Sequence, residues 1–196
     1  MKFVISALTS VALLGVAAPA LAQSDTQSSK DGLYGDLGWS GTQAQGAMTQ
    51  GITGRVGGRY HTYFGVEGEV TGGIASDNRT LGAGTAAQTS VDVKQKLAGA
   101  VYGVGFLPVT SNFDILARVG YGASRYGVTP GNGVAKYDVN ENGIRYGVGA
   151  QYLFNGANGL RVDYTRQHMG SGTDSGGYFS ADKDAGVWSV SLAHKF

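Results

Sequence analysis

Residues 185–196 read AGVWSVSLAHKF and end the chain. Side chains alternate between the two faces of a β-strand, so every second residue shares a face. One face of this stretch is mostly apolar and has an aromatic residue at each end; it consists of Trp188, Val190, Leu192, His194 and Phe196. The opposite face carries mainly small or polar residues. Aromatic residues at both ends of an apolar face are typical of a strand that crosses a membrane, because aromatic girdles lie at both interfaces.

The beginning of the chain has the pattern of a secretory signal peptide. Lys2 supplies the positive charge, residues 3–18 are mainly apolar, and Ala20-Leu21-Ala22 forms an A-x-A cleavage site. We therefore expect a cleaved signal peptide over residues 1–22 and a short polar periplasmic leader over residues 23–31. A single β-barrel domain is expected over residues 32–196.

Composition limits the class of protein and its partners. Segment 1–22 contains Lys2 and no acid, so fourteen Lys+Arg and fourteen Asp+Glu remain after it. This balance gives no sign of the basic stripe that nucleic-acid binding requires. There are 34 Gly and no Cys, so no disulfides stabilise the expected exported domain. After residue 22 no run of about 18 apolar residues occurs, so any membrane crossing must use strands.

Seven further segments alternate in the same way, which predicts eight strands of about 9–11 residues each. The residues that we assign to their apolar, outward faces are Leu33, Leu37 and Trp39; Ile52, Val56 and Tyr60; Phe64, Val66 and Val70; Ala98, Ala100, Tyr102, Val104 and Phe106; Phe113, Ile115, Ala117, Val119 and Tyr121; Ile144, Tyr146, Val148, Ala150 and Tyr152; and Leu160, Val162 and Tyr164. The aromatic residues near the strand ends are expected to form the interface girdles: Tyr34, Trp39, Tyr60, Tyr63, Phe64, Phe106, Phe113, Tyr152, Trp188 and Phe196.

Charged residues recur on the opposite faces, and they decide between two kinds of barrel. The set comprises Asp36, Arg55, Arg59, Glu67, Glu69, Arg118, Arg145, Arg161 and Asp163. The interior of a soluble sandwich or barrel could not desolvate so many charges, whereas the lumen of a membrane barrel is polar. We therefore predict an all-β fold: an antiparallel, eight-stranded, up-and-down transmembrane barrel with its apolar side outward.

The connections alternate between short and long. Short links are predicted at 61–63, 108–112 and 155–158. Long links rich in Gly, Ser, Thr, Asn and Asp are predicted at 41–50, 73–92, 127–142 and 169–184. Short periplasmic turns and long extracellular loops are typical of outer-membrane barrels, which predicts that both termini are periplasmic.

With these strands and the terminal Phe196, residues 23–196 resemble the small eight-stranded outer-membrane barrels of the OmpA, OmpX and opacity-protein kind. The resemblance implies a Gram-negative outer-membrane protein that contacts outer-membrane lipid and lipopolysaccharide. It also implies that the barrel-assembly machinery recognises the C-terminal strand, although the third residue from the end is His194 where this family usually has Tyr or Phe. We expect a monomer without nucleic-acid partners or cofactors.

The nine charged residues of the lumen admit two interpretations. Eight strands leave an interior just wide enough for side chains to fill, so an ion-pair network that plugs the barrel is one interpretation. A narrow or gated ion path between the charges is the other. Glu67 and Glu69 could act as a pair of catalytic carboxylates. Because they are expected to face Arg residues in the lumen, we interpret them as counter-ions of these arginines.

Few residues in the sequence are candidates for a catalytic site. Enzymes that resemble this fold modify lipid A and need His with Ser and an acid near the outer leaflet. Only His168 is expected at that level, with Ser171, Asp174 and Ser175 in the following loop. Because flexible loops often contain such residues and no geometry supports a triad, we predict no enzyme, no metal and no catalytic site.

The sequence thus predicts a non-enzymatic outer-membrane barrel that supports envelope integrity or binds surface ligands through its four long loops. A small low-conductance porin is the first alternative, and a lipid A-modifying enzyme is the second. The surface partner and the permeating solute are open at this point.

Overall fold

The computed structural model describes residues 31–44, 47–81, 89–130, 137–169 and 183–196. The predicted signal peptide, and the predicted leader apart from Asp31, lie outside these residues. Among the described residues, no helix is long and apolar enough to span a membrane.

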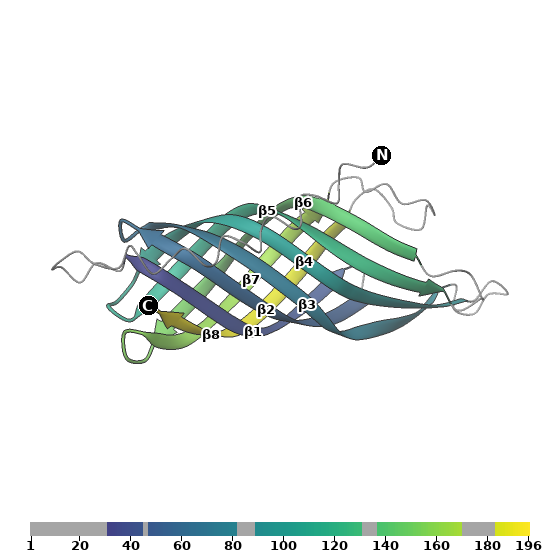
Figure 1. Ribbon diagram of the computed structural model, residues 1–196, viewed down its shortest axis with the longest axis horizontal. Helices are drawn as coiled ribbons and strands as arrows, with labels where there is room; N and C mark the ends of the chain where they lie inside the picture. The colour runs from purple at the N-terminus through teal and green to yellow at the C-terminus, as the bar shows by residue number, and fades with distance from the viewer. Residues whose placement is uncertain (1–30, 45–46, 82–88, 131–136, 170–182) are drawn as a thin grey trace.

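Eight antiparallel strands form one closed barrel with neighbours in sequence order (Figure 1). The strands are β1 (Gly32–Ala44), β2 (Ala47–Tyr60), β3 (Phe64–Leu81), β4 (Thr89–Pro108), β5 (Phe113–Pro130), β6 (Tyr137–Leu153), β7 (Asn158–Met169) and β8 (Lys183–Lys195). β1 pairs with β8 from Tyr34↔Lys195 to Ala44↔Ala185, which closes the barrel. The predicted meander is confirmed.

The two ends of the barrel differ. The C-terminus and the three short turns after β2, β4 and β6 share one end, which we call the turn end. β3, β4, β5 and β6 extend farthest toward the opposite end, which we call the long-strand end (Figure 1). The predicted short links are confirmed within a residue or two, because strands resume at Phe64, Phe113 and Asn158.

The strands are longer than predicted. They run from 12 residues in β7 to 20 residues in β4. All four segments predicted as long loops are therefore partly strand, since β3 continues to Leu81 and β4 begins at Thr89. The loop prediction was wrong here because Gly-, Ser- and Asn-rich sequence disfavours strands locally, whereas pairing with a long neighbouring strand still extends the ladder.

Alternation sets the two faces of seven strands as predicted. Leu37 and Val56, for example, are exposed on the outside, while Asp36 and Arg55 are buried in the interior. The terminal strand follows the same pattern, because Trp188 and Leu192 are exposed and Ser189 is buried.

β4 is the exception. Its Ala98, Ala100, Tyr102, Val104 and Phe106 face the interior and are buried, so the prediction of an outward apolar face was wrong. Directly opposite residues on paired strands share a face. Tyr102 lies opposite Glu67, and Ala100 lies opposite Glu69, so the inward carboxylates of β3 turn these β4 residues inward. Both faces of β4 are apolar or small, and its alternation alone could not decide between them.

Two of the ten predicted girdle residues are also inside the barrel. Tyr34 and Phe106 are each 6% exposed and pack edge to face, with ring centroids 6.0 Å apart. They belong to an apolar cluster that also contains Ala100, Tyr102, Val104 and Leu116. The remaining girdle residues are exposed, apart from half-buried Phe113. One side of the interior is thus an apolar wall.

Candidate functional site

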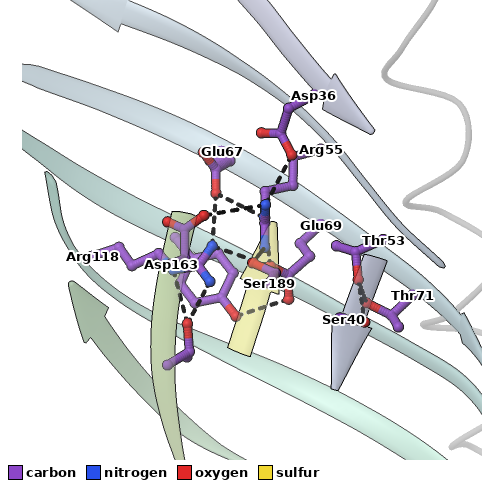
Figure 2. Close-up of polar contacts among 12 residues, drawn as sticks. Asp36, Ser40, Thr53, Arg55, Glu67, Glu69, Thr71, Arg118, Asp163 and Ser189 are labelled. Carbon is purple, nitrogen blue, oxygen red and sulfur yellow. Dashed lines mark hydrogen bonds and ion pairs between the residues drawn. The ribbon is translucent and has the colours of Figure 1, made fainter. Parts of the chain in front are cut away.

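The middle of the interior is filled by charged side chains from five strands. Asp36 comes from β1, Arg55 from β2, Glu67 and Glu69 from β3, Arg118 from β5, and Arg161 and Asp163 from β7. Alternation aims each of them inward, and closure of the barrel brings them within contact distance. Figure 2 shows most of these side chains converging between the strands.

Arg161 and Glu67 form the most deeply buried pair, and both are fully inaccessible. Arg161 Nη1 lies 2.6 Å from Glu67 Oε2, and Arg161 Nε lies 3.1 Å from Asp163 Oδ2. Arg161 Nη1 also lies 3.5 Å from Asp36 Oδ2. One guanidinium therefore contacts carboxylates from three strands.

Arg55 and Arg118 extend the network around Glu69. Arg55 Nε donates to Glu69 Oε2 at 2.8 Å, and its Nη1 donates to Asp36 Oδ1 at 2.8 Å. Arg118 Nη1 lies 3.1 Å from both Glu67 Oε1 and Glu69 Oε2. The Arg118 guanidinium also donates to Thr165 Oγ1. Each glutamate is thus shared by two or more arginines, which is the arrangement that makes buried charges tolerable.

Two tyrosines join the network to the apolar wall. Tyr34 Oη donates to Glu67 Oε2 at 3.1 Å, and Tyr102 Oη donates to Glu69 Oε1 at 3.1 Å. The Arg118 guanidinium lies over the Tyr102 ring, 4.7 Å from its centroid. The sequence did not predict either tyrosine as part of the lumen network. Tyr34 was assigned to an interface girdle, and Tyr102 was assigned to a lipid-facing strand surface.

Arg59 belongs to a second cluster near the turn end. Its Nη1 lies 3.0 Å from Asp114 Oδ2, a buried acid that the sequence analysis did not single out. Its guanidinium also donates to the carbonyl oxygen of Thr62 and lies 4.2 Å from the Phe106 ring centroid. A pocket of about 310 Å³ lies here, lined in part by Tyr34, Arg59, Phe106 and Asp114.

The turn between β2 and β3 is joined by a hydrogen bond to Asp31, the residue before β1. His61 and Thr62 both have positive φ angles, of 50° and 47°, a conformation that costs energy for residues other than glycine. The Thr62 backbone N–H donates to Asp31 Oδ1 at 2.8 Å. This hydrogen bond lowers the pKa of the Asp31 carboxyl below its ordinary value of 3.8.

Arg145 lies toward the long-strand end and is the most loosely paired of the five predicted lumen arginines. Its Nη2 donates to Ser124 Oγ at 2.8 Å, and its Nη1 lies 3.5 Å from Glu69 Oε1. Toward the same end the interior also holds the buried acid Glu141 and a group of hydroxyls: Thr53 Oγ1 lies 2.8 Å from Ser40 Oγ and 2.7 Å from Thr71 Oγ1 (Figure 2). All nine predicted lumen residues are therefore buried, and seven of them meet in one central cluster.

Comparison with known proteins agrees with this architecture. The family described as outer membrane protein beta-barrel domain matches residues 8–196. The chain belongs to that family. As an outer-membrane β-barrel protein, it resides in the outer membrane of a Gram-negative cell.

Solved structures resemble this outer-membrane β-barrel at low sequence identity. Ail, the attachment invasion locus protein of Yersinia pestis, is 14% identical with a TM-score of 0.56, and the match covers 85% of this chain and 99% of Ail. Neisserial surface protein A is 12% identical (TM-score 0.59; 84% and 97% coverage). OprG of Pseudomonas aeruginosa is 13% identical (TM-score 0.59; 88% and 99% coverage). These likenesses establish the fold. No curated protein sequence matches the chain.

The candidate catalytic group of this outer-membrane barrel lies outside the lumen. His168 on β7 is exposed, and its Nδ1 lies 2.9 Å from Asp184 Oδ1 on β8. The loop residues considered with it, Ser171, Asp174 and Ser175, lie outside the described residues. Within the described part of the chain, no group of three His, Asp or Glu side chains is placed to hold a metal ion.

Proposed function

We propose that this outer-membrane β-barrel is a non-enzymatic surface protein. Its lumen is plugged by the central ion-pair network, its long-strand end faces the outside, and that end binds partners. Both termini are then periplasmic. Membrane anchoring and a rigid support for binding at the surface follow from this arrangement.

The observation that carries the proposal is a four-stranded projection at the long-strand end. It comprises residues 76–81, 89–95, 126–130 and 137–142. β3 and β4 remain paired to Leu81↔Thr89, and β5 and β6 to Val128↔Tyr137. In contrast, β2 pairs with β3 only as far as Gln50↔Ala75, and β7 pairs with β6 only as far as Gly143↔Met169.

The projection presents two strand edges. Among the described strands, none pairs with the outer side of 76–81 or of 137–142. Unpaired backbone N–H and C=O groups at a sheet edge are a template for adding an extended segment of another chain. We infer that the edges of the projection, with the connecting loops, are the binding surface. This extends the binding role proposed for the segments 73–92 and 127–142 to the paired strand residues within them.

The contacts inside the barrel favour a plugged lumen rather than an open pore. The central arginines and acids are shared among several partners, and the apolar wall of β4 fills the remaining side. A water-filled path through the lumen would require these side chains to move apart. A small porin remains the second candidate, because Arg145 and the hydroxyl groups beyond it leave the long-strand half of the lumen polar.

An orientation experiment and a binding experiment test the proposal together. The chain has no cysteine, so single-cysteine variants can be labelled on intact cells with a membrane-impermeant maleimide. Ser76→Cys, in the projection, should be labelled, and Ser111→Cys, in the turn after β4, should be labelled only after lysis. The reverse pattern would refute the orientation.

Adhesion of the same cells tests the projection. Replacing residues 128–137 by Asn-Gly shortens the β5–β6 hairpin and keeps Gly127 opposite Asp138, because Asn-Gly favours a two-residue hairpin turn. Cells with this variant should adhere to epithelial layers or polystyrene several-fold less than wild type, with unchanged heat-modifiable gel mobility. Equal adhesion would refute a binding role for this hairpin.

A further inference from the structure

The long-strand half of the lumen, between the central network and the long-strand end, holds buried polar atoms that lack a partner. Among the described residues, five buried side-chain atoms have no hydrogen-bond partner: Thr49 Oγ1, Tyr126 Oη, Arg145 Nε, Gln167 Nε2 and Ser191 Oγ. Ser191 lies opposite Arg161 of the central network, and the other four lie in the long-strand half. A buried donor without a partner costs free energy. The four atoms therefore indicate that another molecule supplies hydrogen-bonding groups here.

A β-bulge in β4 shapes this half of the lumen. The pairing of β4 with β5 shifts register between Gln95 and Leu97, so Lys96 is an extra residue in β4. Gln95 and Ala98 are both buried in the interior as a result, although three positions separate them. Gln95 Oε1 accepts a hydrogen bond of 3.3 Å from Thr42 Oγ1 on β1. Because β1 and β4 are not neighbours in the barrel, we call this contact the cross-lumen hydrogen bond.

The two unpartnered hydroxyl groups belong to the same layer. Thr49 and Tyr126 lie directly opposite the two residues of the cross-lumen hydrogen bond. Tyr126 is also the next inward residue after Ser124, whose Oγ accepts a hydrogen bond from Arg145 Nη2. Strand register thus brings the hydroxyl groups and Arg145 to one side of the central network.

The two unpartnered nitrogen atoms start from adjacent positions. Arg145 on β6 is directly opposite Gln167 on β7, and these residues are 4% and 1% exposed. Side chains directly opposite on antiparallel strands have Cβ atoms about 4.5–5.5 Å apart. Gly122 gives the guanidinium its place, since a Cβ atom there would come within 2.5 Å of Arg145 Nε. Both nitrogens donate hydrogen bonds and accept none, so the group that complements them is an acceptor.

The charge of Arg145 is only loosely matched inside the barrel. Its Nη1 lies 3.5 Å from Glu69 Oε1. Arg55 Nε and Arg118 Nη1 lie closer to the other oxygen of Glu69, at 2.8 and 3.1 Å. Glu69 therefore bonds chiefly to these two arginines. An anionic acceptor beside Arg145 gains a charge-assisted hydrogen bond, which is stronger than a neutral one.

A buried acid and the narrow lumen limit what this anion can be. Glu141 lies directly opposite Ser124 and farther toward the long-strand end than Arg145. Its negative charge disfavours a second anionic group on the same ligand. Eight strands also enclose little more than their own side chains. A ligand that fits is therefore small and carries one negative charge.

We propose that Arg145 and Gln167 bind the carboxylate of a small monocarboxylic acid in the long-strand half of the lumen. One carboxylate oxygen accepts from Arg145 Nε and the other from Gln167 Nε2. The ligand enters from the long-strand end and stops at the central network, so it is bound and does not pass through. This inference goes beyond the surface binding proposed above and does not depend on which end of the barrel faces outside.

Nuclear magnetic resonance of the refolded, ¹⁵N-labelled barrel in detergent micelles tests the site, because each arginine Nε–H gives its own signal. The variants Arg145→Lys and Arg125→Lys identify two of these signals by their loss. Titration with sodium acetate at constant pH and ionic strength should shift the Arg145 signal along a saturating curve. The signal of Arg125, which is exposed outside the lumen, should not saturate. Acetamide, a neutral analogue of similar shape, should leave both signals in place.

A matched pair of glutamine variants tests the second donor. Gln167→Leu should weaken acetate binding at least fivefold, measured on the Arg145 signal. Gln151→Leu makes the same change at a buried glutamine on the turn-end side of the central network and should bind acetate like wild type. Because Gln167 Nε2 has no partner among the described residues, Gln167→Leu should leave the urea midpoint unchanged or raise it. A lower midpoint with unchanged acetate affinity would give Gln167 a structural role and overturn the inference.

Further results would also overturn it. A shift of the Arg145 signal that rises linearly, as that of Arg125 does, would mean that acetate has no site in the lumen. An equal response to acetamide would remove the carboxylate from the recognition. Saturation by chloride at the same concentrations would indicate a general anion site. Magnetisation transfer from water to Arg145 Nε–H that acetate leaves unchanged would show that water alone occupies the place.

The outcome is separate from that of the proposed function. The titration in detergent detects binding inside the lumen whichever end faces outside, whereas cysteine labelling and adhesion test the orientation and the projection. Failure of the acetate titration with correct labelling and adhesion would refute the lumen site alone. Saturable acetate binding with reversed labelling would refute the proposed orientation and support the lumen site.

Discussion

Arg161 shows what a single residue contributes to the interior. It is fully buried and contacts carboxylates of Glu67, Asp163 and Asp36. Removing one partner of a buried ion pair costs far more than the pair contributes net, because the remaining charge is left without compensation. Glu67 keeps contacts with Arg118 and Tyr34 in that case, which limits the damage but does not remove it.

We therefore predict that Arg161→Ala destabilises the barrel by about 3–5 kcal/mol. Urea unfolding in lipid vesicles, followed by gel mobility or tryptophan fluorescence, measures the change in free energy. Arg125→Ala is the matched control, because this exposed arginine pairs with a single carboxylate outside the lumen. Similar unfolding curves for the two variants would contradict a structural role of the buried network.

At the scale of the element, β4 and its neighbour β5 form an interior wall that packs as a protein core does. Leu116 on β5 is 1% exposed and belongs to the cluster of Tyr102, Val104 and Phe106. Leu37 on β1 is 63% exposed on the outer face. A cavity inside the wall stays empty because its close-packed surroundings relax only partly. A cavity on the outer face is refilled by lipid chains.

Leu116→Ala should accordingly cost about 2–5 kcal/mol of unfolding free energy. Leu37→Ala removes the same atoms from the outside and should cost clearly less. Denaturant titration of both variants in the same vesicles provides the comparison. Equal losses would mean that the wall of β4 and β5 is loosely packed or open to water.

At the scale of the whole molecule, closure of the barrel determines whether ions can pass. Strand pairing from β1 to β8 fixes the diameter, and eight strands enclose little more than their own side chains. Charged side chains fill the middle, and the apolar cluster fills the side toward β4. In the proposed plug, this layer separates the polar regions on either side of it.

We predict that the refolded wild-type barrel is silent in a planar bilayer, and that Arg118→Ala is silent as well, because the Arg161 and Arg55 contacts persist. Single-channel recording measures this, with heat-modifiable gel mobility as the proof of folding. Discrete openings of wild type that change in Arg118→Ala would refute the plug and establish the porin alternative.

Local alternation was sufficient to predict the barrel, its eight strands and the burial of nine charged residues. This works because the period of two is a property of the strand itself, visible in Trp188, Val190 and Leu192 or in Arg55 between Ile52 and Val56. Where both faces are apolar, as in β4, the same argument fails. The true face then follows from Glu67 and Glu69 on the neighbouring strand.

The sequence by itself determined the class of fold, because patterns within one strand record which side meets lipid. Only the tertiary structure decided which side chains contact each other inside the barrel. Arg161 and Glu67 are separated by 94 positions in the chain, and the extra residue Lys96 becomes visible only in the pairing of β4 with β5. Such contacts depend on register and closure, which arise between strands and leave no periodic trace within any one of them.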